Sequence, residues 1–531
     1  MAGRLGRGSW AWLLGLLVSA LAFAFIVSPA AASTATITLS PQVGPPTKTV
    51  TVTGSGFAAT ETVIITFNGT QKATATTNAL GSFTASFAVP SSAKPGLYKI
   101  TATGQTSSAS ASAMFRVRTD WPMFHFDVAG TGYNPYENVV GTSNAKNLVR
   151  FGTGALSPQE LEGSSPVLWG GMVYVKGYYN KLYAFSATCL NQATTCQPLW
   201  TASAAGGVSD LAVSQGVVYV SNSDTTGLAA YDAFGSNTYC FGSPRTCNPK
   251  WIGTTKYNGT AAASPVVANG TIYFPGGGQN RTLYAFSAAA GSANCSVSST
   301  GTKTCNPLWS AAVASDISTR PTVANHVIYV SAGKLYAFTD AYSNPTYCNG
   351  SPIKTCTPLW TSTTAAKDGE PAVGSGTVYT NSGNGILSAF STAAGSSCSG
   401  APPAKTCAPL WSTQIGWSYE TPAIAGSVLY TKGVNSFLNA ISSTGTRLWT
   451  TAQGATGQNS TPAVAHGVVY IGDSTGHLRA YNTTRTTACT GTIPTCPALF
   501  VSSQIAAKTS PIIANGVVYS VAANQVAAFH F

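Results

Sequence analysis

The chain has 531 residues, of which 44% are hydrophobic and only 8% are charged, and its formal net charge is +12. This hydrophobic share can bury a sizeable core, which excludes a disordered chain, and the length allows roughly two to four domains. A charged fraction this low is unusual for a cytosolic protein and favours an all-β extracellular one.

The first 32 residues have the layout of a secretory signal peptide. Arg4 and Arg7 form a positive start, residues 10–27 are apolar, and residues 30–32 are three alanines that suit a cleavage site. We therefore expect a secreted or cell-surface protein. The apolar run is long, so an uncleaved membrane anchor remains an alternative, and it is the only membrane contact we expect.

Residues 34–118 alternate apolar and polar side chains over several short segments, with turn signals at Asn68-Gly69 and Pro95-Gly96. This period-two pattern predicts a small immunoglobulin-like β-sandwich. The segment contains no cysteine, so no disulfide is expected within it.

A repeat of about fifty residues fills the rest of the chain, residues 119–531. Each copy has a proline, or Leu211 in one copy, eight residues before a tyrosine. The eight pairs are Pro166/Tyr174, Leu211/Tyr219, Pro265/Tyr273, Pro321/Tyr329, Pro371/Tyr379, Pro422/Tyr430, Pro462/Tyr470 and Pro511/Tyr519. A Leu-x-Ala-aromatic element follows in most copies, and then a tryptophan or phenylalanine. Each copy thus predicts four short strands, A to D, which is typical of a propeller blade.

The last copy ends at Phe531 and lacks its strand D. Residues 147–151 resemble the missing element, so the first and last segments are expected to share one blade and close the ring. This count favours an eight-bladed β-propeller over a seven-bladed one.

All twelve cysteines follow residue 188 and form six close pairs, which predicts six local disulfides in an oxidising compartment. The pairs are Cys189/Cys196, Cys240/Cys247, Cys295/Cys305, Cys348/Cys356, Cys398/Cys407 and Cys489/Cys496. Metal binding would need CxxC spacing or nearby histidines, which are absent, so no metal site is expected.

The repeats resemble the tryptophan-docking repeats of the pyrroloquinoline-quinone (PQQ) propeller superfamily. Residues 121–127 and 130–135 resemble the usual lead-in of that superfamily. The leading domain resembles bacterial immunoglobulin-like modules of the IPT/TIG kind, which implies a spacer or adhesion role. The superfamily includes quinone-dependent dehydrogenases and propellers that only bind or scaffold, so the resemblance implies a fold rather than a chemistry.

Polar and aromatic residues gather just before strand A, at the predicted mouth of the central channel. There they could hold a small polar ligand or a cation, or could simply solvate the mouth and pair with one another. These residues are Asp210, Arg320, Asp368, Glu370, Trp417, Tyr419, Glu420, Gln458, Asn459 and Lys508.

A quinone enzyme would need PQQ, a calcium set of Glu, Asn and Asp, and a catalytic aspartate. Glu370 or Glu420, with Asn459 and Asp210, fits that set only by position, and the adjacent cysteines of many such enzymes are absent. No other catalytic motif is present, and the five histidines are scattered. No catalytic residue is therefore assigned, and no cofactor is expected.

The turns at residues 224–227 and 473–476 could suggest calcium loops, but their few carboxylates favour ordinary hairpin turns. A cation precedes a Thr-Cys pair in four successive C–D loops, at Arg245, Lys303, Lys354 and Lys405. Such a basic rim would attract an acidic glycan, a cell-wall polymer or anionic lipid, unless these are simply solvated turn cations, and nucleic acid fits less well.

The sequence therefore favours a monomeric, non-catalytic binding or scaffolding propeller whose partner is a cell-surface polymer, glycan or protein. The alternatives are a PQQ-dependent oxidoreductase acting on an alcohol or sugar, and a purely structural envelope protein.

Overall fold

The computed structural model is all-β and describes residues 34–531 except 159–162, 178–180, 205–208, 223–226, 256–263, 277–279, 292, 300, 318, 367–368, 417–419, 434–436, 452–459, 474, 506–508 and 523. The proposed signal peptide lies outside the described residues. Helix is limited to α1 (Ala187–Leu190) and the 3-10 turn η1 (Ala145–Asn147) within that part of the chain. None of the described helices is long and apolar enough to cross a bilayer.

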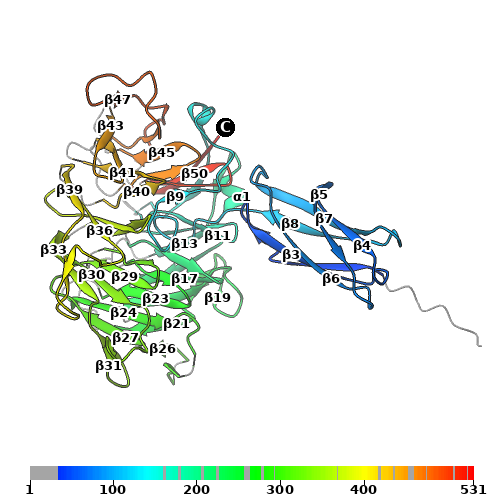
Figure 1. Cartoon of the computed structure of the whole chain (residues 1–531), viewed down its shortest axis with the longest axis horizontal. Coiled ribbons are helices and arrows are strands. Elements are labelled where there is room, and N and C mark those ends of the chain that lie inside the picture. Colours follow the sequence, from blue (N-terminus) through cyan, green and yellow to red (C-terminus); the bar gives the residue numbers. More distant parts are fainter. Residues whose placement is uncertain are drawn as a thin grey trace, which may run out of the picture. The chain divides into compact units, whose positions relative to one another are not determined.

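The described chain divides into two compact units, and most of residues 51–114 belong to the first. Two sheets run through residues 36–117 (Figure 1, blue). One contains β1 (Thr36–Ser40), β3 (Thr49–Ser55) and β6 (Phe83–Ala88). The other contains, in sheet order, β2 (Val43–Gly44), β8 (Ser110–Val117), β7 (Gly96–Gly104), β4 (Thr62–Phe67) and β5 (Thr70–Thr76). Buried and exposed residues alternate along β3 and β4, as the period-two pattern predicted.

Eight sheets form the described part of the second unit, and each begins with a three-residue strand A (Figure 1). These first strands lie side by side in chain order. They are β11 (Val167–Trp169), β16 (Ala212–Ser214), β22 (Val266–Ala268), β28 (Thr322–Ala324), β34 (Ala372–Gly374), β40 (Ala423–Ala425), β44 (Ala463–Ala465) and β49 (Ile512–Ala514).

Strands B and C follow as antiparallel neighbours, because their β-branched and aromatic residues pack on both faces of each sheet. The B strands are β12 (Met172–Lys176), β17 (Val217–Asn222), β23 (Thr271–Pro275), β29 (Val327–Ser331), β35 (Thr377–Asn381), β41 (Val428–Lys432), β45 (Val468–Gly472) and β50 (Val517–Ala522). The C strands are β13 (Lys181–Ser186), β18 (Gly227–Asp232), β24 (Thr282–Ser287), β30 (Gly333–Thr339), β36 (Ile386–Ser391), β42 (Leu438–Ser442), β46 (Leu478–Asn482) and β51 (Gln525–His530).

Strand D carries the repeat tryptophan or Phe500. The D strands are β15 (Trp200–Ser203), β21 (Trp251–Thr254), β27 (Trp309–Ala312), β33 (Trp360–Ala366), β39 (Trp411–Gln414), β43 (Arg447–Thr451) and β48 (Phe500–Val501). The last sheet takes its fourth strand from the other end of the unit, since β10 (Val149–Ala155) pairs antiparallel with β51. The expected sharing between first and last segments is confirmed, although the strand begins at Val149 and η1 precedes it.

All six predicted disulfides are present. Each closes a C–D loop whose last strand pairs in parallel with strand D of the preceding sheet. These added strands are β14 (Thr195–Cys196) on β10, β20 (Thr246–Cys247) on β15, β26 (Lys303–Cys305) on β21, β32 (Lys354–Cys356) on β27, β38 (Thr406–Cys407) on β33 and β47 (Thr495–Cys496) on β43. Four of the loops are hairpins with a further strand, β19 (Cys240–Phe241), β25 (Cys295–Val297), β31 (Cys348–Asn349) or β37 (Cys398–Ser399).

The added strands protect the outer edges of the sheets, because an edge with unpaired N–H and C=O groups invites association. Their cysteines also share an apolar cluster with the tryptophan of the preceding D strand, as Cys240 and Cys247 do with Trp200, which is 1% exposed.

The disulfide at Cys240–Cys247 should stabilise this cover. Replacing both cysteines with serine is expected to lower the free energy of unfolding by about 2.5 kcal/mol, and thus the Tm by about 3 °C, because the open loop regains entropy. The amide of Thr201, which donates to Arg245 O at 2.9 Å, should also exchange faster with solvent. Thermal unfolding and hydrogen exchange measure both effects, and an unchanged Tm would contradict the stabilising role.

Candidate functional site at the channel mouth

The residue two positions before each strand A, which precedes the repeat proline or Leu211, is polar in all eight repeats. These eight residues, here called the polar ring, are Ser165, Asp210, Ser264, Arg320, Glu370, Thr421, Thr461 and Ser510. Because the first strands lie side by side in order, equivalent positions of consecutive strands are neighbours. The ring includes Asp210, Arg320 and Glu370, three of the residues predicted at the mouth.

Backbone N–H groups link neighbouring members of the ring. Ser165 N donates to Asp210 Oδ1 at 2.9 Å, and Asp210 N donates to Ser264 Oγ at 3.0 Å. Arg320 N donates to Glu370 Oε1 at 3.2 Å, and Thr461 N donates to Ser510 Oγ at 2.9 Å in the same way. The side chains of the ring therefore satisfy buried backbone donors where the chain enters strand A.

A second element, residues 119–134 or the lead-in segment, runs along the inner side of the first strands. The central residue of a strand A donates its N–H to this segment in six sheets: Leu168 to Trp121 O, Val213 to Pro122 O, Val323 to Val128 O, Val373 to Ala129 O, Ile424 to Thr131 O and Val464 to Gly132 O, at 2.7–2.8 Å. Its last strand, β9 (Tyr133–Asn134), pairs with β44, and Asn134 Nδ2 donates to Ile513 O in the closing sheet. The lead-in segment thus fills the centre between the first strands.

Close packing explains the glycines of this segment. Gly130 and Gly132 have φ values of +67° and +60°, and a Cβ on either would lie 3.2 Å from a proline carbonyl of a neighbouring repeat. The cavity between the lead-in segment and the ring, lined by Trp121, His125 and Ser165 among others, measures only about 10 Å³. That volume suits a single water molecule.

Arg320 joins the ring to the lead-in segment. Its side chain is 1% exposed, and Nη2 donates to Asp127 O at 2.6 Å. The Asp127 carboxylate in turn accepts from Thr131 N and Thr131 Oγ1 at 3.0 and 2.7 Å. Burial lowers the pKa of Arg320, while Glu370, Asp127 and Asp210 raise it, and an arginine keeps its charge against such shifts. Nη2 of the guanidinium is therefore engaged by the chain itself, while Nε is buried without a hydrogen-bond partner among the described residues.

The two ring carboxylates are only partly exposed. Burial raises the pKa of Glu370 to about 7, against a lowering effect of Arg320. Burial also raises the pKa of Asp210 to about 6, against hydrogen bonds from Ser165. Glu370 Oε2 further accepts from Thr421 Oγ1 at 3.1 Å. Asp127, Asp210, Arg320 and Glu370 thus form one electrostatically coupled group.

His125, which the sequence left unassigned, is fully engaged at the same place. Its Nδ1 lies 3.2 Å from Gly130 O, a carbonyl that can only accept, so Nδ1 carries the proton and Nε2 accepts from Thr461 Oγ1 at 2.6 Å. Burial, together with Arg320, lowers the pKa of His125 to about 3. The neutral imidazole of His125 therefore links the lead-in segment to Thr461 of the polar ring.

Other predicted residues lie apart from this group or outside the described part. Glu420 pairs through Oε1 with Lys432 Nζ at 3.6 Å, and its carbonyl accepts from Asn381 Nδ2. Five predicted mouth residues and Gln458 fall outside the described residues: Asp368, Trp417, Tyr419, Asn459 and Lys508. Among the described residues, no three His, Cys, Asp or Glu side chains are grouped to hold a metal ion.

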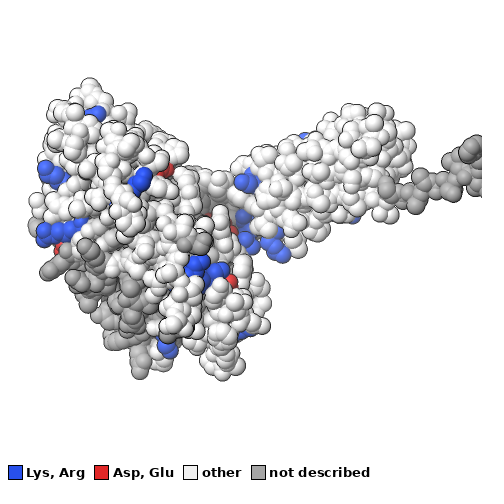
Figure 2. All heavy atoms as spheres, turned by 90° about the horizontal axis from the view of Figure 1, so that it is seen from below, with Lys and Arg blue, Asp and Glu red and all other residues white. Residues whose placement is uncertain are grey.

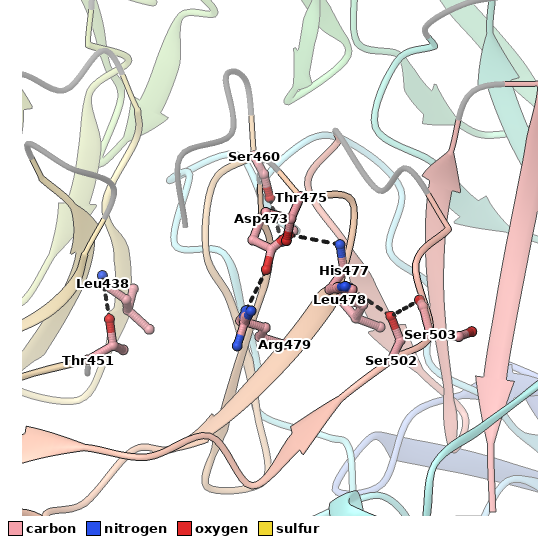
Figure 3. A network of polar contacts seen from close by, with 11 residues as sticks. Leu438, Thr451, Ser460, Asp473, Thr475, His477, Leu478, Arg479, Ser502 and Ser503 are labelled. Carbon is pink, nitrogen blue, oxygen red and sulfur yellow. Dashed lines mark hydrogen bonds and ion pairs between the residues drawn. The ribbon is translucent and has the colours of Figure 1, made fainter. Parts of the chain in front are cut away.

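The turn at Asp473 is held by its own hydrogen bonds (Figure 3). The Asp473 carboxylate accepts from Thr475 Oγ1 and His477 N at 2.7 and 2.8 Å, and it pairs with Arg479 Nε at 2.5 Å. Burial would raise the pKa of Asp473, but these bonds outweigh it and lower that pKa. This agrees with a hairpin turn rather than a calcium loop, and residues 224–226 of the other turn lie outside the described part.

Three of the four predicted rim cations fold back onto their own C–D loops. Arg245 donates to Gly235 O and Asn237 Oδ1, while Lys354 and Lys405 donate through Nζ to Tyr342 O and Ala394 O at 2.9 Å. On the face drawn in Figure 2, basic side chains form small separate groups on a mostly uncharged surface. A continuous basic rim is not visible on that face.

Three of the ring residues were found from the sequence because charged residues stand out in a chain with few charges. Ser165, Ser264, Thr421, Thr461 and Ser510 were missed, although all five occupy the position before the strand A proline. This shared position before the proline is the sequence feature that could have identified them. No local signal placed His125 and Asp127 in the group.

A family model described as outer membrane protein assembly factor BamB matches residues 139–399 and 351–530. A macroglobulin-like domain model matches residues 32–117, which supports an immunoglobulin-type domain there. This model is not one of the IPT/TIG kind. No curated protein matches the chain.

Solved structures share the propeller-like fold. Quinohemoprotein alcohol dehydrogenase from Comamonas testosteroni has a TM-score of 0.54 at 13% identity, covering 77% of this chain and 80% of that one. A europium-containing methanol dehydrogenase has a TM-score of 0.54 at 11% identity, covering 78% and 98%. BamB from Moraxella catarrhalis has a TM-score of 0.48 at 13% identity, covering 72% and 98%. At such identities the two dehydrogenases show the fold alone.

Removing the guanidinium of Arg320 should loosen the lead-in segment. Arg320→Ala is expected to destabilise the propeller by about 3–5 kcal/mol, because it leaves Glu370 and Asp210 without their buried cation and Asp127 O without a donor. Limited proteolysis within residues 121–134 and the Tm measure the effect. Arg281→Ala, which removes a half-exposed ion pair with Asp316, is the matched control and should change little. Equal effects of the two variants would contradict the role of Arg320.

The raised pKa values of Glu370 and Asp210 predict that the free energy of unfolding decreases as pH rises. Their folded pKa values, about 7 and 6, lie above the ordinary 4.5 and 3.8, so the stabilisation is complete below about pH 4 and is lost as pH rises through 6 to 7. Glu370→Gln cannot ionise and should remove a pH-dependent loss on the order of 2 kcal/mol, reduced from the full shift by partial exposure. Thermal unfolding of wild type and variant between pH 4 and 8 tests this, and parallel curves would refute it.

Proposed function

Because the chain belongs to the family whose model is described as outer membrane protein assembly factor BamB, we propose that it is a non-catalytic binding and scaffolding propeller of the exported space. The eight sheets of its described part are, in this proposal, eight blades around one axis, joined where β10 meets β51. Six disulfides support an oxidising compartment, in agreement with secretion or surface display. In this proposal the N-terminal domain is a spacer and the protein is a monomer.

The observation that carries the proposal is the filled centre. The lead-in segment hydrogen-bonds to the first strands, and Arg320 is committed to Asp127 O. In this proposal the mouth beside the ring is the binding surface, and Asp210, Glu370 and Glu420 belong to it. Asp368, Trp417, Tyr419, Asn459 and Lys508 are assigned to it from the sequence alone, since they lie outside the described residues. Such a surface suits recognition of a cell-surface polymer, glycan or protein better than enclosure of a reacting molecule.

The alternative, a PQQ-dependent oxidoreductase, would need PQQ and Ca²⁺ at this mouth. Calcium takes six to eight oxygen ligands, mostly from ionised carboxylates and carbonyls. Of the carboxylates proposed for it, Glu370 and Asp210 are coupled electrostatically to the buried Arg320, and Glu420 already pairs with Lys432. Within the described residues, this donor set does not fit the calcium ion that the quinone would need.

Incubation with PQQ and Ca²⁺ separates the two proposals. We expect no rise in Tm and no dye reduction on a panel of alcohols and sugars, with a known quinone dehydrogenase as the positive control. A Tm rise that needs both PQQ and Ca²⁺, with turnover that Glu370→Gln lowers, would make the protein an enzyme.

A further inference from the structure

One outer edge of the propeller lacks the cover that six others have. Strand β39 is the outermost strand of a four-stranded sheet, the smallest among the eight in the described residues. The segment that would cover it lies between β42 and β43 and consists of residues 443–446 alone, without cysteines. The edge of β48 also lacks an added strand, but η1 lies against it.

The missing cover changes the exposure of the repeat tryptophan. Trp411 is partly exposed, whereas Trp200, Trp251, Trp309, Trp360 and Trp449 are at most 3% exposed. The loop at Ser443 and Gly445 contacts Trp411 and Thr413 through its carbonyls, but it pairs with no backbone group of β39.

The register identifies the backbone groups that this edge presents. In the preceding sheet Ala337 faces Trp360, and the next residue, Thr361, donates its N–H outward to Lys405 O at 3.0 Å. In the sheet of β39, Ala389 faces Trp411, so Ser412 takes the place of Thr361. Ser412 is exposed. Its Oγ lies 2.9 Å from Ser388 Oγ, as expected for a non-hydrogen-bonded antiparallel pair, in which the side chains are close and the backbone N–H and C=O groups point away from the partner strand. Its N–H and C=O therefore face outward.

A cation stands at the end of the same edge. Arg447 Nη2 donates to Gln414 O at 3.2 Å, and Arg447 Nε is buried without a hydrogen-bond partner. Among the described residues, no carboxylate lies within ion-pair distance of Arg447. Its side chain lines a cavity of about 370 Å³ together with Ile415, Thr450 and Thr495. A carboxylate that entered this cavity would find a donor and an opposite charge.

We propose that β39 is a docking edge for an extended segment of a partner protein, which pairs in parallel with Ser412 and Thr413 and places an acidic side chain beside Arg447. The six added strands of the chain show which backbone geometry this edge position accepts. A second copy is disfavoured as the occupant, because its own six disulfide loops already pair within that copy. The edge does not involve the channel mouth, so this inference is independent of the proposed function.

The probe is a synthetic peptide of residues 395–410, closed by its Cys398–Cys407 disulfide, which is the loop that covers β33. Residue 408 of the peptide would face Gln414, since Thr406 and Cys407 face the positions of Ser412 and Thr413. A second peptide carries Ala408→Glu. Titration of each labelled peptide against the purified full-length protein should give an affinity at least about fivefold higher for the acidic peptide. Arg447→Gln should abolish this preference.

Ser412→Pro removes the outward N–H and no bond within the sheet, a substitution that an edge strand tolerates. It should weaken both peptides about tenfold, whereas the matched control Ser412→Ala should bind like wild type. Protection of the Ser412 amide against hydrogen exchange upon peptide addition is an independent readout, should the proline variant fail to fold.

Three results would overturn the proposal: no binding of either peptide by wild type, equal binding by wild type and Ser412→Pro, or a dimer of the free protein that Ser412→Pro disrupts. The last would assign the edge to a second copy.

Discussion

The pairing of β10 with β51 is the interaction on which the propeller depends. It joins strands that lie more than 360 residues apart in the sequence, at the register Val149 to His530 and onward. Closing so long a loop costs chain entropy, yet that cost grows only slowly with loop length. Without this pair, the closing sheet would lack its outer strand and the first strands of the unit would line an open arc. The antiparallel ladder therefore turns a row of similar sheets into a closed structure.

Closure removes the ends of the row but leaves each sheet with an outer edge. Each disulfide-closed loop covers such an edge, because its last strand pairs with strand D of the preceding sheet. One device then performs three tasks: it pairs edge N–H groups, buries the repeat tryptophan and links adjacent sheets. The sheet of β39 is the informative exception, because a loop shorter than the others leaves its Trp411 partly exposed. The same physical rule that explains the covered edges thus identifies the surface most open to a partner.

At the axis the constraint is different, because eight strand entries bring polar backbone groups together away from water. The polar ring and the lead-in segment satisfy those groups, and Arg320 balances the carboxylates that this arrangement buries. Burial raises the pKa of Glu370 and Asp210 even though a cation is near, so the cost of desolvation exceeds the attraction there. A centre that is filled and neutralised by the chain favours binding at the outer surfaces over chemistry in the channel.

The sequence by itself determined the repeats, the strand order within each repeat, the six disulfides and the joining of the two ends. It could do so because each of these depends on residues close in the sequence or on a pattern that recurs eight times. The tertiary structure alone decided what surrounds Arg320, since the partners Asp127 and Glu370 come from different parts of the chain. It also decided that His125 meets Thr461, which lies 336 residues away. No local periodicity encodes such contacts, because they arise only when the ring closes and places one lead-in segment against every first strand it passes.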